Sequence, residues 1–289
     1  MQVSYGTHYG SWLRGAVKLM LLAGWISLVF LFQPLIVLCS RRFYFRSARF
    51  VHATVSKIIG LQVMTRGTPC LTEPTLYVAN HSSYLDIPAL GSIVLGSFIA
   101  KGENERWPVF GALCKLQDTV FIKRQATQAG VQRDVLREKL EQGRSLIIFA
   151  EGTSTDGCHI LPFKSSLFAT VQKPLPSGKP IMIQPISITA VTLDGLPMGR
   201  TLRPLYAWYG DMTLGGHGWP MLKLGKMGVM IEFHEPVAST AFPDRKALAH
   251  YCDEQVQAGV VRALLGRDKP AIQLPPPAAP RALPQEAGA

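Results

Sequence analysis

A run of twenty residues, 19–38, constrains this chain more than any other feature, because only Ser27 and Gln33 in it are clearly polar. As an α-helix rising about 1.5 Å per residue, the run would be roughly 30 Å long, the thickness of the hydrocarbon core of a bilayer. Pro34 lies near the far end and can kink the helix or divide it. A full membrane span and a shorter segment that enters one leaflet therefore both remain open.

Two other interpretations of this run are weaker. A buried helix of a soluble core does not explain why basic residues flank the run on both sides. A cleaved signal peptide needs small residues before its cleavage site, whereas bulky Ile36, Val37 and Leu38 stand there before Cys39. We therefore expect the segment to be retained in the protein.

The positive charge of the chain is concentrated around the apolar run. Of the formal net charge of +11, residues 1–60 account for +7, because they contain no Asp or Glu. A basic protein is typical of a polyanionic partner, either nucleic acid or an anionic membrane surface. Next to an apolar run this charge indicates anionic membrane lipid and no nucleic acid. The arginines just after the run favour a location on the cytoplasmic face of the inner membrane for the domain that follows; they are Arg41, Arg42, Arg46 and Arg49.

Residues 41–59 repeat apolar side chains at roughly helical spacing among Arg and Lys, and Gly60 is a plausible helix stop. The pattern fits an interfacial helix, and equally a solvated helix that packs on the main domain. We expect residues 1–60 to form a basic membrane-anchoring helical segment. The five cysteines form no C-x-x-C pair, so neither a zinc site nor a disulfide framework is indicated.

The middle of the chain alternates short apolar runs with helical stretches, which predicts an α/β fold in which a mixed sheet is covered by helices. We expect strands at residues 75–79, 97–100, 119–122, 146–149, 181–189 and 229–233. Helices are expected at 87–94, 127–141, 165–171 and 245–265. Residues 192–226 carry no clear pattern. We predict one α/β domain over residues 61–266 and a disordered Pro/Ala-rich tail over residues 267–289.

The first predicted strand ends at Asn80, and the residues that follow it carry the clearest chemistry. His81 and Asp86 are five residues apart, so their side chains meet only if the chain bends between them. A carboxylate that holds one imidazole nitrogen leaves the other free to accept a proton from a hydroxyl. Two plainer interpretations remain: a structural histidine, and Asp86 as a helix N-cap before Pro88.

Three further stretches end or interrupt predicted strands. Residues 121–124 finish with the basic pair Lys123 and Arg124, which also suits a solvated strand end. Residues 149–155 contain Gly152, whose turn would let backbone amides approach an anion, although an ordinary strand-to-loop turn looks the same. Residues 184–188 place Pro185 inside an apolar strand, which can mean only a bulge.

Together and in this order, the four stretches resemble the glycerolipid acyltransferases of the 1-acylglycerol-3-phosphate acyltransferase type, whose first signature is N-H-x-x-x-x-D. The resemblance implies that His81, held by Asp86, removes the proton from the hydroxyl of lysophosphatidic acid, which then attacks an acyl-ACP or acyl-CoA thioester to give phosphatidic acid. It implies no metal and no prosthetic group. The acceptor head group would be bound by Arg124, Glu151, Gly152 and Thr153.

Two departures from the family pattern concern this head-group site. The third motif commonly continues E-G-T-R-S, but here Ser154 stands in place of the arginine, and the often acidic position before Arg124 is Lys123. Lys164, just before the expected helix at residues 165–171, is a candidate to supply the lost charge. The acceptor is therefore lysophosphatidic acid bound differently, or another lysolipid such as a lyso-ornithine lipid.

Two other classes of function remain open. A non-catalytic membrane lipid-binding protein fits the same basic N-terminus but leaves the spacing of His81 and Asp86 unexplained. A membrane-tethered serine hydrolase could use Ser82 or Ser154 with His81, but the chain has no G-x-S-x-G elbow around either serine.

Overall fold

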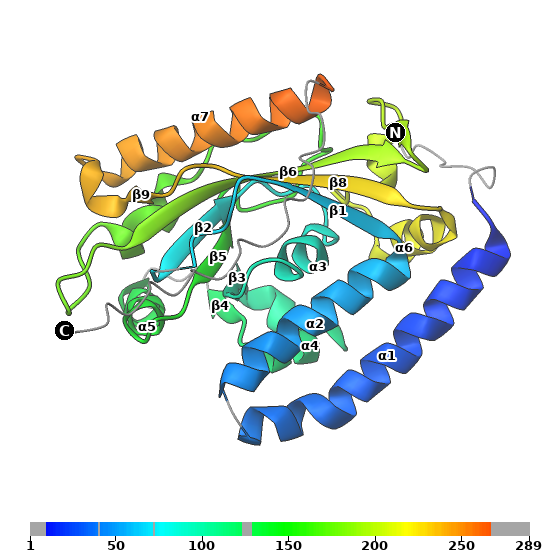
Figure 1. Ribbon diagram of the computed structural model, residues 1–289, viewed down its shortest axis with the longest axis horizontal. Helices are drawn as coiled ribbons and strands as arrows, with labels where there is room; N and C mark the ends of the chain where they lie inside the picture. Colours follow the sequence, from blue (N-terminus) through cyan, green and yellow to red (C-terminus); the bar gives the residue numbers. More distant parts are fainter. Residues whose placement is uncertain (1–9, 40, 72, 123–128, 267–289) are drawn as a thin grey trace, which may run out of the picture.

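The computed structural model describes residues 10–39, 41–71, 73–122 and 129–266, and Figure 1 shows their arrangement. The predicted tail, residues 267–289, lies outside the described residues. Within them the chain folds around a nine-stranded sheet in which the main path runs β1-β8-β6-β2-β5-β3-β4. The strands are β1 (Leu61–Arg66), β2 (Thr75–Ala79), β3 (Ser97–Lys101), β4 (Val120–Ile122), β5 (Leu146–Phe149), β6 (Met182–Leu193), β7 (Leu196–Pro197), β8 (Met227–Phe233) and β9 (Val237–Ala238).

The sheet is mixed, as the sequence predicts. β2 pairs in parallel with β5 on one side and β6 on the other, whereas β6 pairs antiparallel with β8. Side chains of β2 alternate between the two faces, so Leu76 and Val78 join one apolar cluster and Tyr77 and Ala79 join the other. Both faces of this central strand are buried, which places its carboxyl end inside the molecule.

Different helices cover the two faces. α5 (Ala129–Glu141) and α7 (Arg245–Leu264) contribute to the cluster that contains Leu76, and Figure 1 shows α7 lying along this side of the sheet. α3 (Asp86–Gly91) and α6 (Leu214–Lys223) contribute to the other cluster. Figure 1 shows α2 (Arg41–Ile59) on that second side, with α1 (Trp12–Cys39) beyond it.

α1 and α2 run antiparallel as a helical hairpin, which we call the N-terminal hairpin (residues 12–59). Trp25 of α1 packs edge-to-face on Phe50 of α2 with ring centroids 5.6 Å apart. α1 is one continuous helix that includes Pro34. Of the described helices, α1 alone is long and apolar enough to cross a membrane, and only 11% of its most apolar window is buried, unlike the core helix of a soluble protein.

Lys18 attaches the hairpin to the rest of the molecule. Its buried ammonium donates to the carbonyl oxygens of Ile59 (2.8 Å) and Leu224 (2.9 Å), at the ends of α2 and α6, and to that of Gly225 (3.1 Å). A cation at helix carboxyl ends satisfies carbonyls that have no partner within the helix. Gly60 follows α2 with φ of +90°, and a Cβ there would lie 2.6 Å from the Gly225 oxygen, so the predicted helix stop requires glycine.

Several elements differ from the sequence-based expectation. β1, β7 and β9 and the helices α4 (Phe110–Leu116) and α6 are not predicted, and residues 165–171 form a 3₁₀ helix. The unassigned residues 192–226 contain β7, a 3₁₀ turn at Arg203–Leu205 and α6. α6 contains three glycines and a proline, and its stability therefore comes from packing on α1 and the sheet.

Candidate active site

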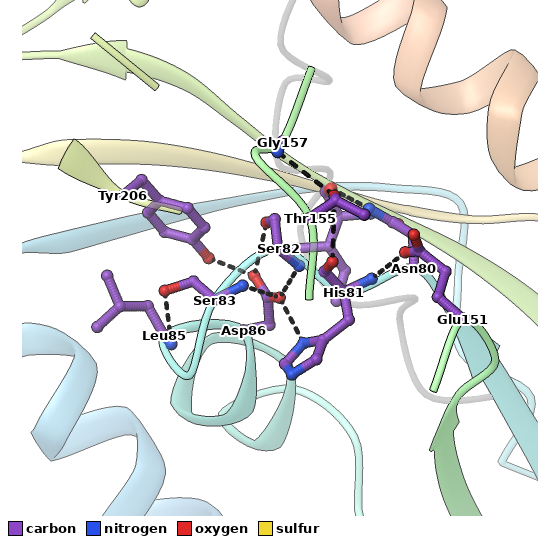
Figure 2. A network of polar contacts seen from close by, with 11 residues as sticks. Asn80, His81, Ser82, Ser83, Leu85, Asp86, Glu151, Thr155, Gly157 and Tyr206 are labelled. Atoms are coloured by element: carbon purple, nitrogen blue, oxygen red, sulfur yellow. Dashed lines mark hydrogen bonds and ion pairs between the residues drawn. The ribbon is translucent and has the colours of Figure 1, made fainter. Parts of the chain in front are cut away.

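The turn between β2 and α3, residues 80–86, holds most of the polar groups of the site, and we call it the catalytic turn (Figure 2). It begins at Asn80, which is buried and bonds to the neighbouring strand β6. The Asn80 amide donates to the Ile188 oxygen at 2.9 Å, and its carbonyl accepts from the Ile188 N–H at 2.8 Å. This two-way bond fixes the end of β2 before the chain bends.

The bend brings His81 and Asp86 together. His81 Nδ1 lies 2.9 Å from Asp86 Oδ2, and the same oxygen accepts the backbone N–H groups of Ser82 (2.8 Å) and Ser83 (2.9 Å). Asp86 is fully buried. Asp86 is the first residue of α3, and the N-cap is Leu85. The carboxylate of Asp86 accepts N–H groups of the catalytic turn and does not cap the first turn of α3. The interpretation of Asp86 as an N-cap is therefore wrong.

The imidazole of His81 is held in a defined orientation. Its ring stacks on Phe149, the last residue of β5, with centroids 4.0 Å apart and an interplanar angle of 16°. A carboxylate accepts hydrogen bonds, so the bond to Asp86 fixes the proton on Nδ1 and leaves Nε2 as the acceptor nitrogen. The side chain of His81 keeps 19% of its surface exposed. The pair thus has the arrangement of a general base oriented by a carboxylate.

Glu151 lies beside the catalytic turn with its side chain directed inward. Its Oε1 accepts the His81 backbone N–H at 2.7 Å, and its Oε2 accepts the Leu161 N–H at 2.8 Å. The residue is 1% exposed, and burial raises the pKa of its carboxyl to about 7 despite these two bonds. Both oxygens accept backbone N–H groups, so Glu151 helps to hold the catalytic turn in place, and its contact with an acceptor head group remains a prediction.

The residues after Glu151 form a turn that adjoins the catalytic turn. Gly152 has φ of +68°, and a Cβ there would lie 2.8 Å from the Lys164 ammonium, so the turn and this cation are in close contact. Thr153 is exposed, and the Thr155 N–H donates to the His81 oxygen at 3.0 Å. The structure therefore brings Gly152, Lys164 and His81 into one region. Arg124 lies outside the described residues.

Sequence reasoning missed one buried contact of Asp86. Tyr206, which belongs to the unassigned residues 192–226, donates its hydroxyl to Asp86 Oδ1 at 2.7 Å across a separation of 120 residues (Figure 2). No spacing or motif in the sequence connects these two residues. The only available signal was the concentration of aromatic residues in that stretch, which is also typical of core packing.

Within the described part of the chain, no group of three or more His, Cys, Asp or Glu side chains is arranged to hold a metal ion. The cysteines at positions 70, 114, 158 and 252 are free thiols. Burial raises the pKa of the Cys114 thiol to about 11, so it is a poor nucleophile at neutral pH. The His81–Asp86 contact itself is suited to proton transfer, and it lies beside a glycine turn and a lysine.

Comparisons with known proteins agree with this chemistry. The sequence pattern of a family described as Acyltransferase matches residues 56–189, which include both turns. The lyso-ornithine lipid O-acyltransferase of Brucella abortus is 39% identical over 228 residues, covering 78% of this chain and 85% of that protein. The 1-acyl-sn-glycerol-3-phosphate acyltransferase of Neisseria meningitidis is 32% identical over 206 residues, covering 70% of this chain and 75% of that protein.

A solved structure gives the same fold. The crystal structure of the 1-acyl-sn-glycerophosphate acyltransferase from Thermotoga maritima superposes with a TM-score of 0.65 at 21% identity, covering 86% of this chain and 94% of that chain. The chain therefore belongs to the acyltransferase family. Within it, the chain is an enzyme of the 1-acylglycerol-3-phosphate acyltransferase type, which confirms the resemblance seen in its motifs.

Membership in this family implies an acyl thioester donor and a lysolipid acceptor, and therefore a role in lipid biosynthesis. The exposed apolar surface of α1 suggests that the enzyme associates with a membrane. The relatives act on at least two different acceptors according to their names, so the family alone does not choose between a lyso-ornithine lipid and lysophosphatidic acid.

Proposed function

We propose that the protein is a lysolipid O-acyltransferase whose acceptor is a lyso-ornithine lipid, with His81 as the general base and Asp86 as its orienting partner. The observation that carries the proposal is the buried His81–Asp86 contact of 2.9 Å inside a chain that is 39% identical to a lyso-ornithine lipid O-acyltransferase. The contact supplies the base, and the relative supplies the acceptor class.

The reaction needs no covalent enzyme intermediate, because a thioester is already activated. Nε2 of His81 takes the proton of the acceptor hydroxyl as its oxygen attacks the thioester carbonyl. Asp86 stabilises the imidazolium that forms. The tetrahedral intermediate then expels the thiolate, which takes the proton back from Nε2. The products are the O-acylated lipid and the free thiol of the acyl carrier protein or coenzyme A, and His81 returns to its neutral form.

The head-group region favours a zwitterionic acceptor over a phosphate. Ser154 stands where the family commonly has an arginine, so this turn carries one cation less for a doubly charged phosphate. An amino-acid head group carries a carboxylate and an ammonium, and Lys164 beside Gly152 supplies a cation for the carboxylate. Lysophosphatidic acid is the second candidate, favoured by the Neisseria relative, with Lys164 and Arg124 as its phosphate ligands.

The same proposal covers the location and organisation of the enzyme. The N-terminal hairpin would bury its exposed apolar side chains in lipid, and its basic residues would lie near anionic head groups on the cytoplasmic face of the inner membrane. The proposal also divides the chain into an anchoring segment (residues 1–60), a catalytic domain (61–266) and a tail (267–289). Either acyl-ACP or acyl-CoA is the donor, and no cofactor is used.

The proposal is tested with the full-length enzyme in mixed micelles, which is offered lyso-ornithine lipid and lysophosphatidic acid with each labelled thioester. We expect acyl transfer to lyso-ornithine lipid, and a loss of roughly 10²–10⁴-fold in His81→Ala, the usual contribution of a general base. A matched control is His250→Ala, because His250 is an exposed histidine on α7 that pairs with Glu254. Transfer only to lysophosphatidic acid would select the second acceptor, and near-normal turnover in His81→Ala would refute the assigned base.

A further inference from the structure

One distant segment, residues 203–217, contacts three residues of the catalytic turn: Ser82, Tyr84 and Asp86. Its three contacts are the Trp208 N–H donating to the Ser82 oxygen (2.8 Å), the Tyr84 hydroxyl bonded to His217 Nδ1 (3.1 Å), and the Tyr206 hydroxyl donating to Asp86 Oδ1 (2.7 Å). The first two hold the backbone and an aromatic side chain. The third reaches the carboxylate that is bonded to His81.

The two oxygens of Asp86 are bound in different ways. Oδ2 accepts from His81 and from two backbone N–H groups, all within 2.9 Å. Oδ1 accepts from Tyr206 at 2.7 Å, while the Ser82 hydroxyl is at a weaker 3.5 Å. Tyr206 is therefore the principal described donor to Oδ1. Without it, the carboxylate would be held on one side only and one buried oxygen would lose its main partner.

Tyr206 is suited to act as a permanent donor. It is 1% exposed, and burial next to the negative charge of Asp86 raises its pKa well above the ordinary value. The phenol therefore keeps its proton over the whole range in which the enzyme would work. A hydrogen bond to a carboxylate draws charge onto the donor and lowers the basicity of the carboxylate.

We propose that Tyr206 is a positioning residue of the His81–Asp86 pair: its hydroxyl fixes the rotamer of Asp86 and moderates the charge that Asp86 presents to His81. The inference rests on the proposed role of His81 as the base. Through Asp86, Tyr206 sets the direction in which Nε2 points. Residues 192–226, unassigned from sequence, thus contribute a residue that acts on the catalytic base.

Other titratable groups also face this region and must be separated from the effect of Tyr206. Glu151 bonds the His81 backbone, and burial raises the pKa of its carboxyl to about 7, inside the range of a pH profile. Other titratable or charged groups around the two turns include Tyr84, Asp156, His159, Lys164, Arg203, His217 and Asp253. All of these are unchanged when only the Tyr206 hydroxyl is removed, so a difference between two profiles reports that hydroxyl.

The test compares pH profiles of kcat/KM for the full-length enzyme and Tyr206→Phe. Removing the hydroxyl leaves more charge on Asp86, which stabilises the imidazolium and moves the acid limb to higher pH by about half a unit. Looser positioning of Nε2 should lower kcat by about ten-fold, with KM changed less than two-fold.

Tyr77→Phe is the matched control. Tyr77 is also 1% exposed, and its hydroxyl donates to the Cys70 backbone oxygen rather than to a group of the His81–Asp86 pair. It should show a comparable loss of thermal stability with an unshifted acid limb. An unshifted limb in Tyr206→Phe, or the same shift in both variants, would overturn the proposal and leave Tyr206 as a core residue.

A second variant keeps the test decisive where Tyr206→Phe does not fold. Replacing Tyr206 with 3-fluorotyrosine makes the phenol a stronger donor with little change in shape, and the acid limb should move to lower pH, opposite to the Phe variant. No movement in that direction contradicts the proposal. The His81→Ala result separates the two levels: an active His81→Ala enzyme removes the proposed function, whereas an inactive one with unshifted Tyr206 profiles removes only this inference.

Discussion

The catalytic turn and the N-terminal hairpin differ in how their buried polar groups are hydrogen-bonded and in how much of their apolar surface is exposed. In the turn, the fully buried Asp86 has four hydrogen-bond donors within 2.9 Å. In the hairpin, large apolar side chains are exposed along α1, and the buried side-chain nitrogens of Trp25 and Gln33 have no hydrogen-bond partner. The structure of the turn depends on directed hydrogen bonds, whereas the placement of the hairpin depends on how much apolar surface it buries.

The difference shows what each region requires. A proton transfer depends on distances of a few tenths of an ångström, so each buried polar group around His81 needs a fixed partner. Burial in lipid is non-directional and depends on the amount of apolar surface, so individual positions in α1 are less constrained. Lys18 and Arg49 are exceptions in the hairpin, because they bond to carbonyl oxygens of the domain: Lys18 to those of Leu224 and Gly225, and Arg49 to that of Ser92 at 3.0 Å.

The largest effect is expected from a variant that weakens the hydrogen bonds of the catalytic turn. Asp86→Asn keeps the shape of the side chain but removes the charge that stabilises the imidazolium, and we expect kcat to fall by about 10³-fold. Steady-state kinetics on the micellar enzyme measures this. The matched control is Asp156→Asn, because Asp156 makes a similar 2.8 Å contact with the exposed His159. It should stay within about three-fold of the original kcat. Equal losses in the two variants would mean that the charge of Asp86 has no special role.

The next prediction tests whether membrane binding by the hairpin depends on its exposed apolar area. Leu31 and Phe32 are 62% and 51% exposed, and changing both to serine should weaken binding to anionic vesicles by about 2 kcal/mol, or roughly 30-fold in partition. Vesicle sedimentation measures the partition, and kcat in micelles should be unchanged. The control changes Val261 and Leu265, which are similarly exposed at the end of α7, to serine. Equal partition of both double variants would show that the hairpin is not the membrane-binding surface.

The last effect is on stability rather than on binding or turnover and concerns Glu151, whose pKa is raised from 4.5 to about 7 by burial. Between these values the folded protein binds a proton that the unfolded chain has released, so stability falls as pH rises, by up to about 1.4 kcal/mol per pH unit. Burial lowers the pKa of His52 and His234 to about 4, which gives slopes of the opposite sign, so the contribution of Glu151 is measured as a difference. The free energy of unfolding of the original protein minus that of Glu151→Gln should decrease from pH 5 to 7. The same difference taken with the surface variant Glu138→Gln should not change with pH, and a constant difference for Glu151→Gln would contradict the prediction.

Much of the sheet could be predicted from sequence, because its central strands are short apolar runs between turns. β2 and β5 begin and end at the predicted residues, and the mixed character of the sheet is confirmed. β1 was missed because it has no continuous apolar run. It forms by pairing in parallel with β8, which lies far along the chain. α6 was missed because its glycines and proline lower its intrinsic helix propensity.

The site was predicted in part. The His81–Asp86 contact follows from a strand, a bend and two residue types at one spacing, which is local information. The inward direction of Glu151 does not follow from its motif, because the two N–H groups that bind it come from separate segments. The roles of Gly152, Thr153 and Lys164 in binding an acceptor remain predictions.

The sequence by itself determined the family, the pairing of His81 with Asp86 and the apolar character of α1, because each depends on residues that are close together in the chain. Only the tertiary structure decided that Glu151 holds the backbone of His81, that Lys18 joins the hairpin to α6, and that Tyr206 reaches Asp86. These contacts link segments far apart in sequence, and they exist because burial leaves each polar group no partner except the one that the fold brings to it.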